Sequence, residues 1–187
     1  MKYLIAGLGN IGAEYQSTRH NIGFDVLDAL AGASNSFFSS GRLADVAEVK
    51  HRGKKLILIK PTTYMNLSGK AINYWLQQEK IPVENLLVVL DDLALPFGTI
   101  RIRPNGSDAG HNGLKNINEI LGHNRYARLR FGIGNNFPKG QQVDFVLGTW
   151  SDEEQAALKP RINQSIHAIL SFVSQGLGPT MSQFNNK

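Results

Sequence analysis

A short apolar run at residues 85–90, ending in Asp91 and Asp92, constrains the fold more than any other feature. A continuous run of this kind is typical of a strand that is buried on both faces of a sheet. The residues that follow such a strand emerge together at one edge of the sheet. The sequence therefore predicts a central strand that delivers two carboxylates to that edge.

The rest of the chain alternates between strand and helix patterns. Further strands are expected over residues 2–6, 44–50, 55–60, 99–103 and 128–132. Helices are expected over residues 22–31, 67–80 and 152–174, with another beginning near Asn112. Residues 176–187 look like a frayed polar tail. No repeat or linker divides the 187 residues, so we expect a single-domain three-layer α/β/α fold over residues 1–187.

Composition excludes several classes of site. The chain has no cysteine, which rules out thiol nucleophiles, thiolate metal sites and disulfides, and fits a reducing, cytoplasmic location. No apolar run approaches the length that spans a bilayer. The formal charge of +5 suits a polyanionic partner but equally an ordinary basic protein. Six basic residues crowd one third of the chain: Arg101, Arg103, Lys115, Arg125, Arg128 and Arg130.

The first glycines match a dinucleotide-binding pattern without its context. Residues 7–12 read Gly-Leu-Gly-Asn-Ile-Gly after the first expected strand. In a dinucleotide fold the third glycine opens a helix, whereas Gly12 here runs into a polar loop. The acidic residue expected about 20 positions on is also missing from a strand end, since Asp25 and Asp28 fall within an expected helix. An oxidoreductase is therefore disfavoured.

Two histidines are candidates for chemistry. His20 precedes a helix, where a capping or surface role is the ordinary explanation, but a strand-end Asp91 would hold its imidazole in one tautomer and stabilise its charged form. Such a dyad makes a general base. His111 lies among glycines that allow close approach to a ligand, and Asn112 beside it could donate an amide or simply cap the helix. These two explanations have equal weight.

Other hydrolytic mechanisms lack their motifs. The remaining histidines have no metal-ligand spacing, so no metal site is expected. The chain has no G-x-S-x-G elbow, H-E-x-x-H motif, Walker A sequence or cysteine. Water is therefore the expected nucleophile.

Several polar segments follow one another in a specific order: Gly7–Asn10, Tyr15, Thr18–Asn21, Lys60–Gly69, Asp91–Leu93 and Gly110–Lys115. In this order and spacing they resemble the bacterial-type peptidyl-tRNA hydrolase family, and the resemblance extends from Met1 to about Gly148. It implies a monomer with a twisted mixed sheet between helices. It also implies hydrolysis of the ester that joins a peptide to the 3′ ribose of tRNA, with no cofactor.

The resemblance also suggests roles for individual residues. His20 resembles the family's general base, Asp91 the carboxylate that orients it, and Asn10 the residue that distinguishes peptidyl-tRNA from free aminoacyl-tRNA. Further positions resemble substrate contacts: Tyr15, Tyr64, Met65, Asn66, His111 and Asn112. Four basic residues are expected to pair with phosphates of the tRNA partner: Arg101, Arg103, Lys115 and Arg130.

The chain departs from the family pattern near Asp91. Leu90 and Ala94 stand where the family often places His and Asp, and Asp92 replaces the usual Glu. An alternative function is therefore a catalytically silent RNA-binding protein that kept the basic face.

Overall fold

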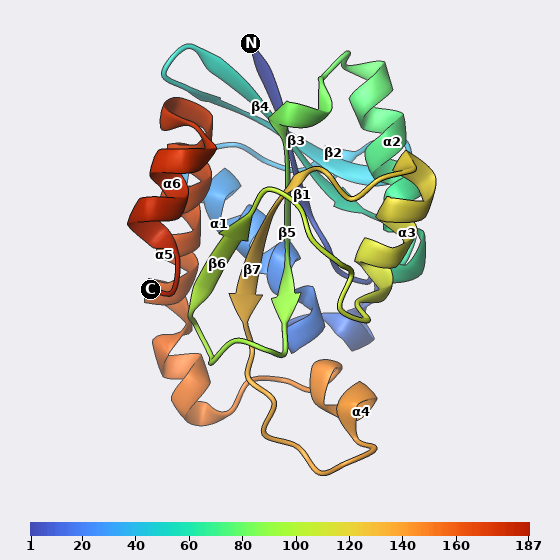
Figure 1. The fold of residues 1–187 in the computed structure, drawn as a ribbon, viewed down its shortest axis with the longest axis vertical. Helices are drawn as coiled ribbons and strands as arrows, with labels where there is room; N and C mark the ends of the chain where they lie inside the picture. Colours follow the sequence, from blue (N-terminus) through green and yellow to red (C-terminus); the bar gives the residue numbers. More distant parts are fainter.

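Residues 86–90 form the buried central strand that their composition predicts. In the computed structural model, which describes all residues 1–187, this strand belongs to a seven-stranded sheet of order β2-β3-β4-β1-β5-β7-β6 (Figure 1). The strands are β1 Lys2–Gly7, β2 Ser39–Ser40, β3 Ala44–His51, β4 Lys54–Pro61, β5 Leu86–Asp92, β6 Ile100–Arg103 and β7 Ala127–Gly132. The helices are α1 Ile22–Ala33, α2 Ser68–Gln78, α3 Asn112–Leu121, α4 Gln142–Val146, α5 Asp152–Gln175 and α6 Leu177–Phe184.

The sheet is mixed, as expected. Strands β4, β1, β5 and β7 are parallel neighbours, whereas β3, β2 and β6 add antiparallel pairs at the two sides. After β1 the chain forms β2, β3 and β4 on one side of β1, and it then crosses to form β5 on the other side. The strand order therefore reverses around β1, and in open α/β sheets ligands bind beyond the carboxyl strand ends at such a point.

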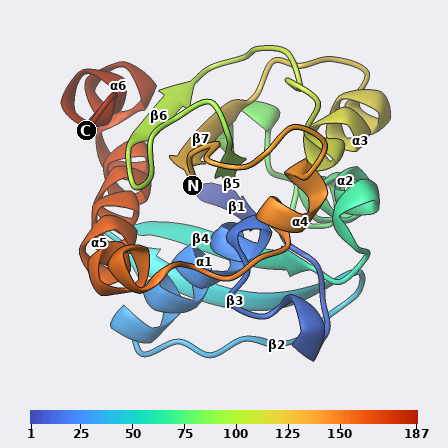
Figure 2. The same cartoon turned by 90° about the horizontal axis from the view of Figure 1, so that it is seen from below.

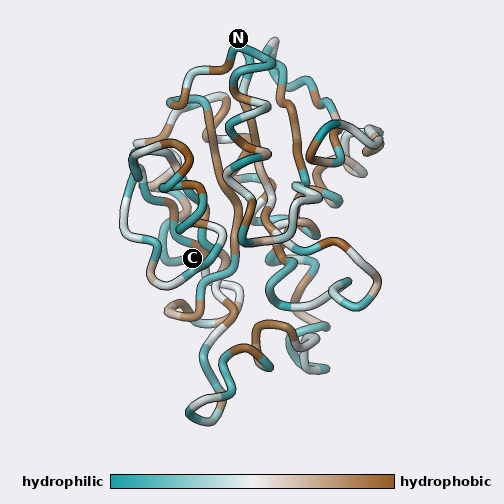
Figure 3. Tube along the Cα trace, turned by 90° about the vertical axis from the view of Figure 1, so that its right-hand side faces the viewer, coloured by the Kyte–Doolittle hydropathy of each residue, from teal (hydrophilic) through white to brown (hydrophobic).

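Helices cover both faces of the sheet, which gives the three expected layers. Alternate residues of β5 enter two separate cores: Leu87 and Val89 pack with α1 and α5, while Leu86, Val88 and Leu90 pack with α2 and α3. Figure 3 shows the apolar colouring concentrated on these inner strands. The central strand can be apolar throughout because neither of its faces meets water. No helix is both long and apolar enough to cross a membrane.

The first glycines serve packing between β1 and α1. A Cβ atom on Gly7 would lie 2.3 Å from the backbone oxygen of Gly23 in the first turn of α1. Strand β1 and helix α1 could therefore not approach so closely if residue 7 carried a side chain. After Gly12 the chain forms a 3₁₀ turn, Ala13–Tyr15, instead of the α-helix that a dinucleotide site requires. The glycine pattern is thus explained by close packing.

The structure corrects the expectation for the C-terminal residues. Residues 176–187 are not a frayed tail, because residues 177–184 form α6 and Phe184 is buried against the sheet. The side chain of Asn185 accepts from the Ile102 amide at 2.6 Å and donates to the Ile102 carbonyl at 3.1 Å. These two bonds satisfy the backbone N–H and C=O of Ile102, which face outward because β6 is an edge strand. Helix α4 and the short strand β2 were not expected from the sequence.

Candidate active site

The catalytic candidates meet at the carboxyl ends of β1 and β5, the lower end of the sheet in Figure 1. His20 lies in a 3₁₀ turn, Arg19–Asn21, that follows β1 and leads into α1. Asp91 is the penultimate residue of β5 and is only 4% exposed. His111 stands immediately before α3. Segments far apart in sequence therefore converge because their strands are neighbours in the sheet.

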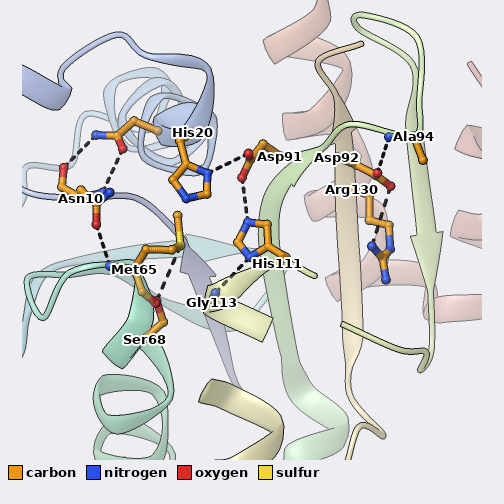
Figure 4. A network of polar contacts seen from close by, with 11 residues as sticks. Asn10, His20, Met65, Ser68, Asp91, Asp92, Ala94, His111, Gly113 and Arg130 are labelled. Carbon is orange, nitrogen blue, oxygen red and sulfur yellow. Dashed lines mark hydrogen bonds and ion pairs between the residues drawn. The ribbon is translucent and has the colours of Figure 1, made fainter. Parts of the chain in front are cut away.

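Asp91 is hydrogen-bonded to both imidazoles (Figure 4). Its Oδ2 lies 2.8 Å from Nδ1 of His20, and its Oδ1 lies 2.8 Å from Nε2 of His111. Nδ1 of His111 accepts from the backbone N–H of Gly113 at 3.1 Å, so the ring proton of His111 is on Nε2 and points at Asp91. His20 donates its Nδ1 proton to Asp91, which leaves its Nε2 free to accept a proton.

The electrostatics of the pair match that arrangement. Burial alone would lower the pKa of His20, but the charge of Asp91 and its hydrogen bond outweigh burial and raise that pKa above its usual value. Burial alone would likewise raise the pKa of Asp91, yet His20 and His111 together hold it well below the usual range. Asp91 is therefore ionised, and it favours the protonated form of His20.

Neutral groups flank His20 on its other side. Asn10 follows β1, and its Oδ1 accepts from the backbone N–H of Met65 at 2.6 Å. This fixes the orientation of the amide, so the Asn10 NH₂ group is the part left to donate to a substrate. Figure 4 shows Asn10 and Met65 on one side of the His20 ring, with Asp91 and His111 on the other.

Asn21 supports Asn10, a contact that was not predicted from the sequence. It is 3% exposed, accepts from the Asn10 N–H at 2.9 Å and donates to the Asn10 carbonyl at 2.8 Å. These two bonds fix the backbone of Asn10 relative to the turn that carries His20. An asparagine directly after a candidate histidine was the available signal, but neither its burial nor its partner could be read from the sequence.

The segment before α2 brings Met65 close to the His20 ring (Figure 4). Tyr64 has φ of +63°, an unusual conformation for an aromatic residue. Met65 is buried, and a Cβ on Gly113 would lie 2.8 Å from its sulfur, so Gly113 is needed for this contact. The Ser68 hydroxyl donates to the Met65 carbonyl at 2.7 Å. Tyr64 and Asn66 remain exposed, and Tyr15 lies in the separate 3₁₀ turn after Gly12.

A cavity of about 200 Å³ opens beside His20 and Asp91. Asn112 and Arg130 line it from α3 and β7, and Val143 and Val146 line it from α4. Figure 2, seen from the lower end, shows α4 lying over this part of the molecule.

The structure decides between the two explanations offered for Asn112, capping and an amide free to donate. His111, and not Asn112, caps α3, because its Nδ1 accepts from the Gly113 amide. Asn112 is thereby the first residue of the helix and is exposed at the cavity. Leu67 occupies the N-cap position of α2 without a side-chain bond.

The basic residues do not form one solvated face. Arg103 and Lys115 are exposed. Arg101 instead binds the Asn186 side chain at 2.8 and 3.0 Å, and Arg130 donates to the Ser107 carbonyl at 3.2 Å. Arg128 is fully buried, where it donates to the carbonyls of Gly106, Asn124 and Tyr126. Burial of Arg128 was invisible in the sequence because its partners are backbone groups.

The departures near Asp91 leave the dyad intact. Leu90 has no exposed surface and packs into the core under α2 and α3. The backbone N–H of Ala94 donates to Asp92 Oδ1 at 2.8 Å, which shapes the turn after β5. The His20 bond to Asp91 involves neither residue, so these substitutions give no support to a silent RNA-binding protein.

His20, Asp91 and His111 are the one set of side chains that could hold a metal ion, since their ligand atoms lie within 4.8 Å of one another. Metal binding would require the two imidazole nitrogens that now bond Asp91 to give up those bonds. The donor set is therefore already satisfied as a hydrogen-bonded triad, an arrangement suited to moving a proton.

Comparisons with known proteins agree on one family. The model of the family described as "Peptidyl-tRNA hydrolase" matches residues 4–187. The peptidyl-tRNA hydrolase of Phocaeicola vulgatus is 59% identical over 187 residues, 100% of both chains, and that of Porphyromonas gingivalis is 55% identical over 185 residues, 99% of this chain and 100% of the relative. The crystal structure of the Acinetobacter baumannii enzyme has 31% identity and a TM-score of 0.91, covering 98% of this chain and 94% of that one. The chain therefore belongs to the peptidyl-tRNA hydrolase family.

Proposed function

We propose that this chain hydrolyses the ester bond between the peptide and the 3′ ribose of peptidyl-tRNA, with His20 as the general base for water. Family membership supports the reaction. One observation carries the assignment of the base: the 2.8 Å contact between Asp91 and Nδ1 of His20, which leaves Nε2 free. No other imidazole beside the cavity has a free ring nitrogen, because both nitrogens of His111 are bonded.

The proposed reaction begins with a water molecule held by Nε2 of His20. As the water oxygen attacks the ester carbonyl carbon, its proton passes to Nε2, and the resulting imidazolium is stabilised by Asp91. The negative charge on the carbonyl oxygen is assigned to neutral amide donors, the side chains of Asn10 and Asn112. When the tetrahedral intermediate collapses, the C–O bond to the ribose breaks and the 3′ oxygen takes the proton from His20.

The other site residues are proposed to bind substrate. Tyr15, Tyr64, Met65 and Asn66 are assigned to the peptide and the end of the tRNA, with His111 acting mainly through Asp91. Phosphates are assigned to the basic residues Arg101, Arg103, Lys115 and Arg130, of which Arg103 and Lys115 are exposed. Affinity for tRNA should fall as salt rises.

We further propose that the enzyme acts as a monomer in the cytoplasm. All residues of the catalytic cluster come from one chain, so no partner subunit is needed to complete it. The absence of cysteine fits a reducing compartment.

The experiment that tests this function compares N-acetyl-aminoacyl-tRNA with the same unblocked aminoacyl-tRNA, without added metal. We expect the blocked ester to be cleaved and the unblocked one to be largely spared. Binding of both tRNAs without cleavage of either would contradict the proposal and would favour the silent RNA-binding protein instead.

A further inference from the structure

Arg19, the residue before His20, connects the catalytic turn to a distant part of the chain. Its Nη1 donates to the Phe145 carbonyl in α4 at 3.2 Å, and its Nη2 pairs with Glu154 Oε1 in α5 at 3.0 Å. The guanidinium carbon also lies 4.1 Å from the centre of the Phe145 ring. One side chain that is only 12% exposed therefore holds two helices. Removal of one partner of a buried ion pair is costly because the other charge is left unpaired.

The backbone strengthens the same connection. The Arg19 N–H donates to the Gly148 carbonyl at 2.9 Å, and Thr18 forms a β-bridge with Thr149. A Cβ on Gly148 would lie 3.0 Å from Nη1 of Arg19, so this position leaves little room for a side chain. The chain between α4 and α5 thus lies directly along the turn that carries His20.

Glu154 also belongs to the start of α5. The oxygen that pairs with Arg19 accepts from the Ser151 backbone N–H at 2.9 Å, completing the capping box of that helix. The position of Arg19 is therefore tied to the first turn of a 24-residue helix packed on the core. This gives Arg19 a rigid support.

Helix α4 has no side-chain cap, but Phe145 and Val146 pack against the core and the Phe145 ring lies 5.0 Å from the ring of Phe137. The helix has five residues, too few to be stable without tertiary contacts. Val143 and Val146 of α4 line the cavity beside His20, and Val143 is 66% exposed. Phe145, between them, faces Arg19 instead. The wall of the cavity therefore depends on what holds Phe145.

We propose that Arg19 is a positioning residue that holds α4 as the apolar wall of the substrate cavity, while His20 keeps its geometry through Asp91. This proposal rests on the proposed hydrolysis of peptidyl-tRNA. Because the wall contacts substrate before and during the reaction alike, its loss should weaken binding more than it slows chemistry.

The test compares Arg19→Met with Arg42→Met. Arg42 is a matched control because it also stacks on an aromatic ring, 5.3 Å from the centre of Tyr74, but contacts neither α4 nor α5. We expect Arg19→Met to raise KM for N-acetyl-aminoacyl-tRNA about tenfold, with kcat changed less than about threefold and the acidic limb of the pH–rate profile unmoved. Arg42→Met should leave KM unchanged.

Two further variants separate positioning from folding. Glu154→Gln removes the charge partner but not the aromatic stacking, so it should raise KM less than Arg19→Met does. It also serves as the test if Arg19→Met fails to fold. Arg19→Lys should recover KM only partly. The planar guanidinium of arginine stacks on Phe145 while it pairs with Glu154, and the compact ammonium of lysine cannot make both contacts.

Limited trypsin cleavage after the exposed Lys139, just before α4, gives a readout independent of activity. Cleavage should be faster in Arg19→Met and unchanged in Arg42→Met. An unchanged KM together with unchanged cleavage would overturn the proposal, as would a shifted pH–rate limb, which would mean that Arg19 acts through His20. Absence of turnover in the wild type would refute the proposed function instead.

Discussion

The two sides of His20 are built from different chemistry. On one side a buried carboxylate, Asp91, is bonded to two imidazoles, and the pKa values of His20 and Asp91 are displaced in opposite directions. On the other side Asn10, Asn21 and the Met65 backbone are joined by neutral hydrogen bonds. The charged side sets how strongly His20 holds a proton. The neutral side fixes the position of the Asn10 NH₂ group, which is a hydrogen-bond donor.

This division suits an ester substrate. The attacking water must lose a proton, which calls for a base whose proton affinity is raised by a fixed charge. The carbonyl oxygen gains negative charge, which neutral amide donors stabilise without competing for the proton.

The largest effect is expected from His20 itself. His20→Ala should lower kcat on the order of 10²–10⁴-fold, because water loses its base. Binding of tRNA should change little, since His20 is small and most affinity comes from phosphate contacts. Single-turnover hydrolysis and a filter-binding assay measure the two quantities. The exposed His167→Ala is the control, and equal losses of turnover and binding would contradict the role of His20.

Asp91→Asn tests the charged side without changing its volume. We expect kcat to fall by roughly 10²-fold, because an amide cannot stabilise the His20 imidazolium as a carboxylate does. Asp92→Asn removes the same charge one residue along the chain, from a side chain that bonds Ala94 and pairs with Arg130 at 3.7 Å, and should lower kcat less than about tenfold. Similar losses in both variants would mean that net charge, and not the Asp91 contact, matters.

Asn10 tests the neutral side. Asn10→Asp keeps an oxygen for the Met65 N–H but removes the NH₂ donor, whereas Asn10→Ala removes both. If donation to the substrate is the main role, both variants should lower kcat/KM for the blocked substrate about tenfold or more. Near-normal activity of Asn10→Asp would show instead that Asn10 only supports Met65.

The smallest effect on turnover is expected from His111. His111→Ala leaves Asp91 bonded to His20 but removes its second donor, so kcat should fall only a few-fold. A lowered pKa of Asp91 stabilises the fold above the unfolded-state pKa of about 3.9, and this stability is lost as pH falls. The variant should lose about 1–3 kcal/mol in urea unfolding at pH 7 and less near pH 3. An equal loss of unfolding free energy at pH 7 and at pH 3 would contradict a stabilising bond between His111 and the ionised Asp91.

The fold was largely predictable because its signals are local. The apolar run before Asp91 predicts a buried strand by composition alone, and the start of α1 follows from the spacing of Val26, Leu27 and Leu30. Helix α6 was missed although Leu177, Met181 and Phe184 recur at helical spacing. Its many polar residues concealed that face, and Asn185 satisfies backbone groups that no sequence pattern reveals.

The site was predictable in part. His20 and Asp91 could be paired because one follows a strand and the other ends the neighbouring strand. The partners of Arg19, Asn21 and Arg128 could not be predicted, because they are backbone carbonyls or side chains distant in sequence. A count of basic residues likewise cannot tell the buried Arg128 from the exposed Arg103. Candidate catalytic residues near strand ends are thus easier to predict from the sequence than the residues that hold the surrounding loops in place.

The pH–rate profile of Asp91→Asn beside the wild type tests the central claim most directly. Burial lowers the pKa of His20 and Asp91 raises it by more, so removing the Asp91 charge should lower that pKa. Activity requires neutral His20 and is lost as pH falls through its pKa. The account predicts that the acidic limb of the wild-type profile moves to lower pH in Asp91→Asn, at a reduced plateau rate. An acidic limb at the same pH in both proteins would contradict it.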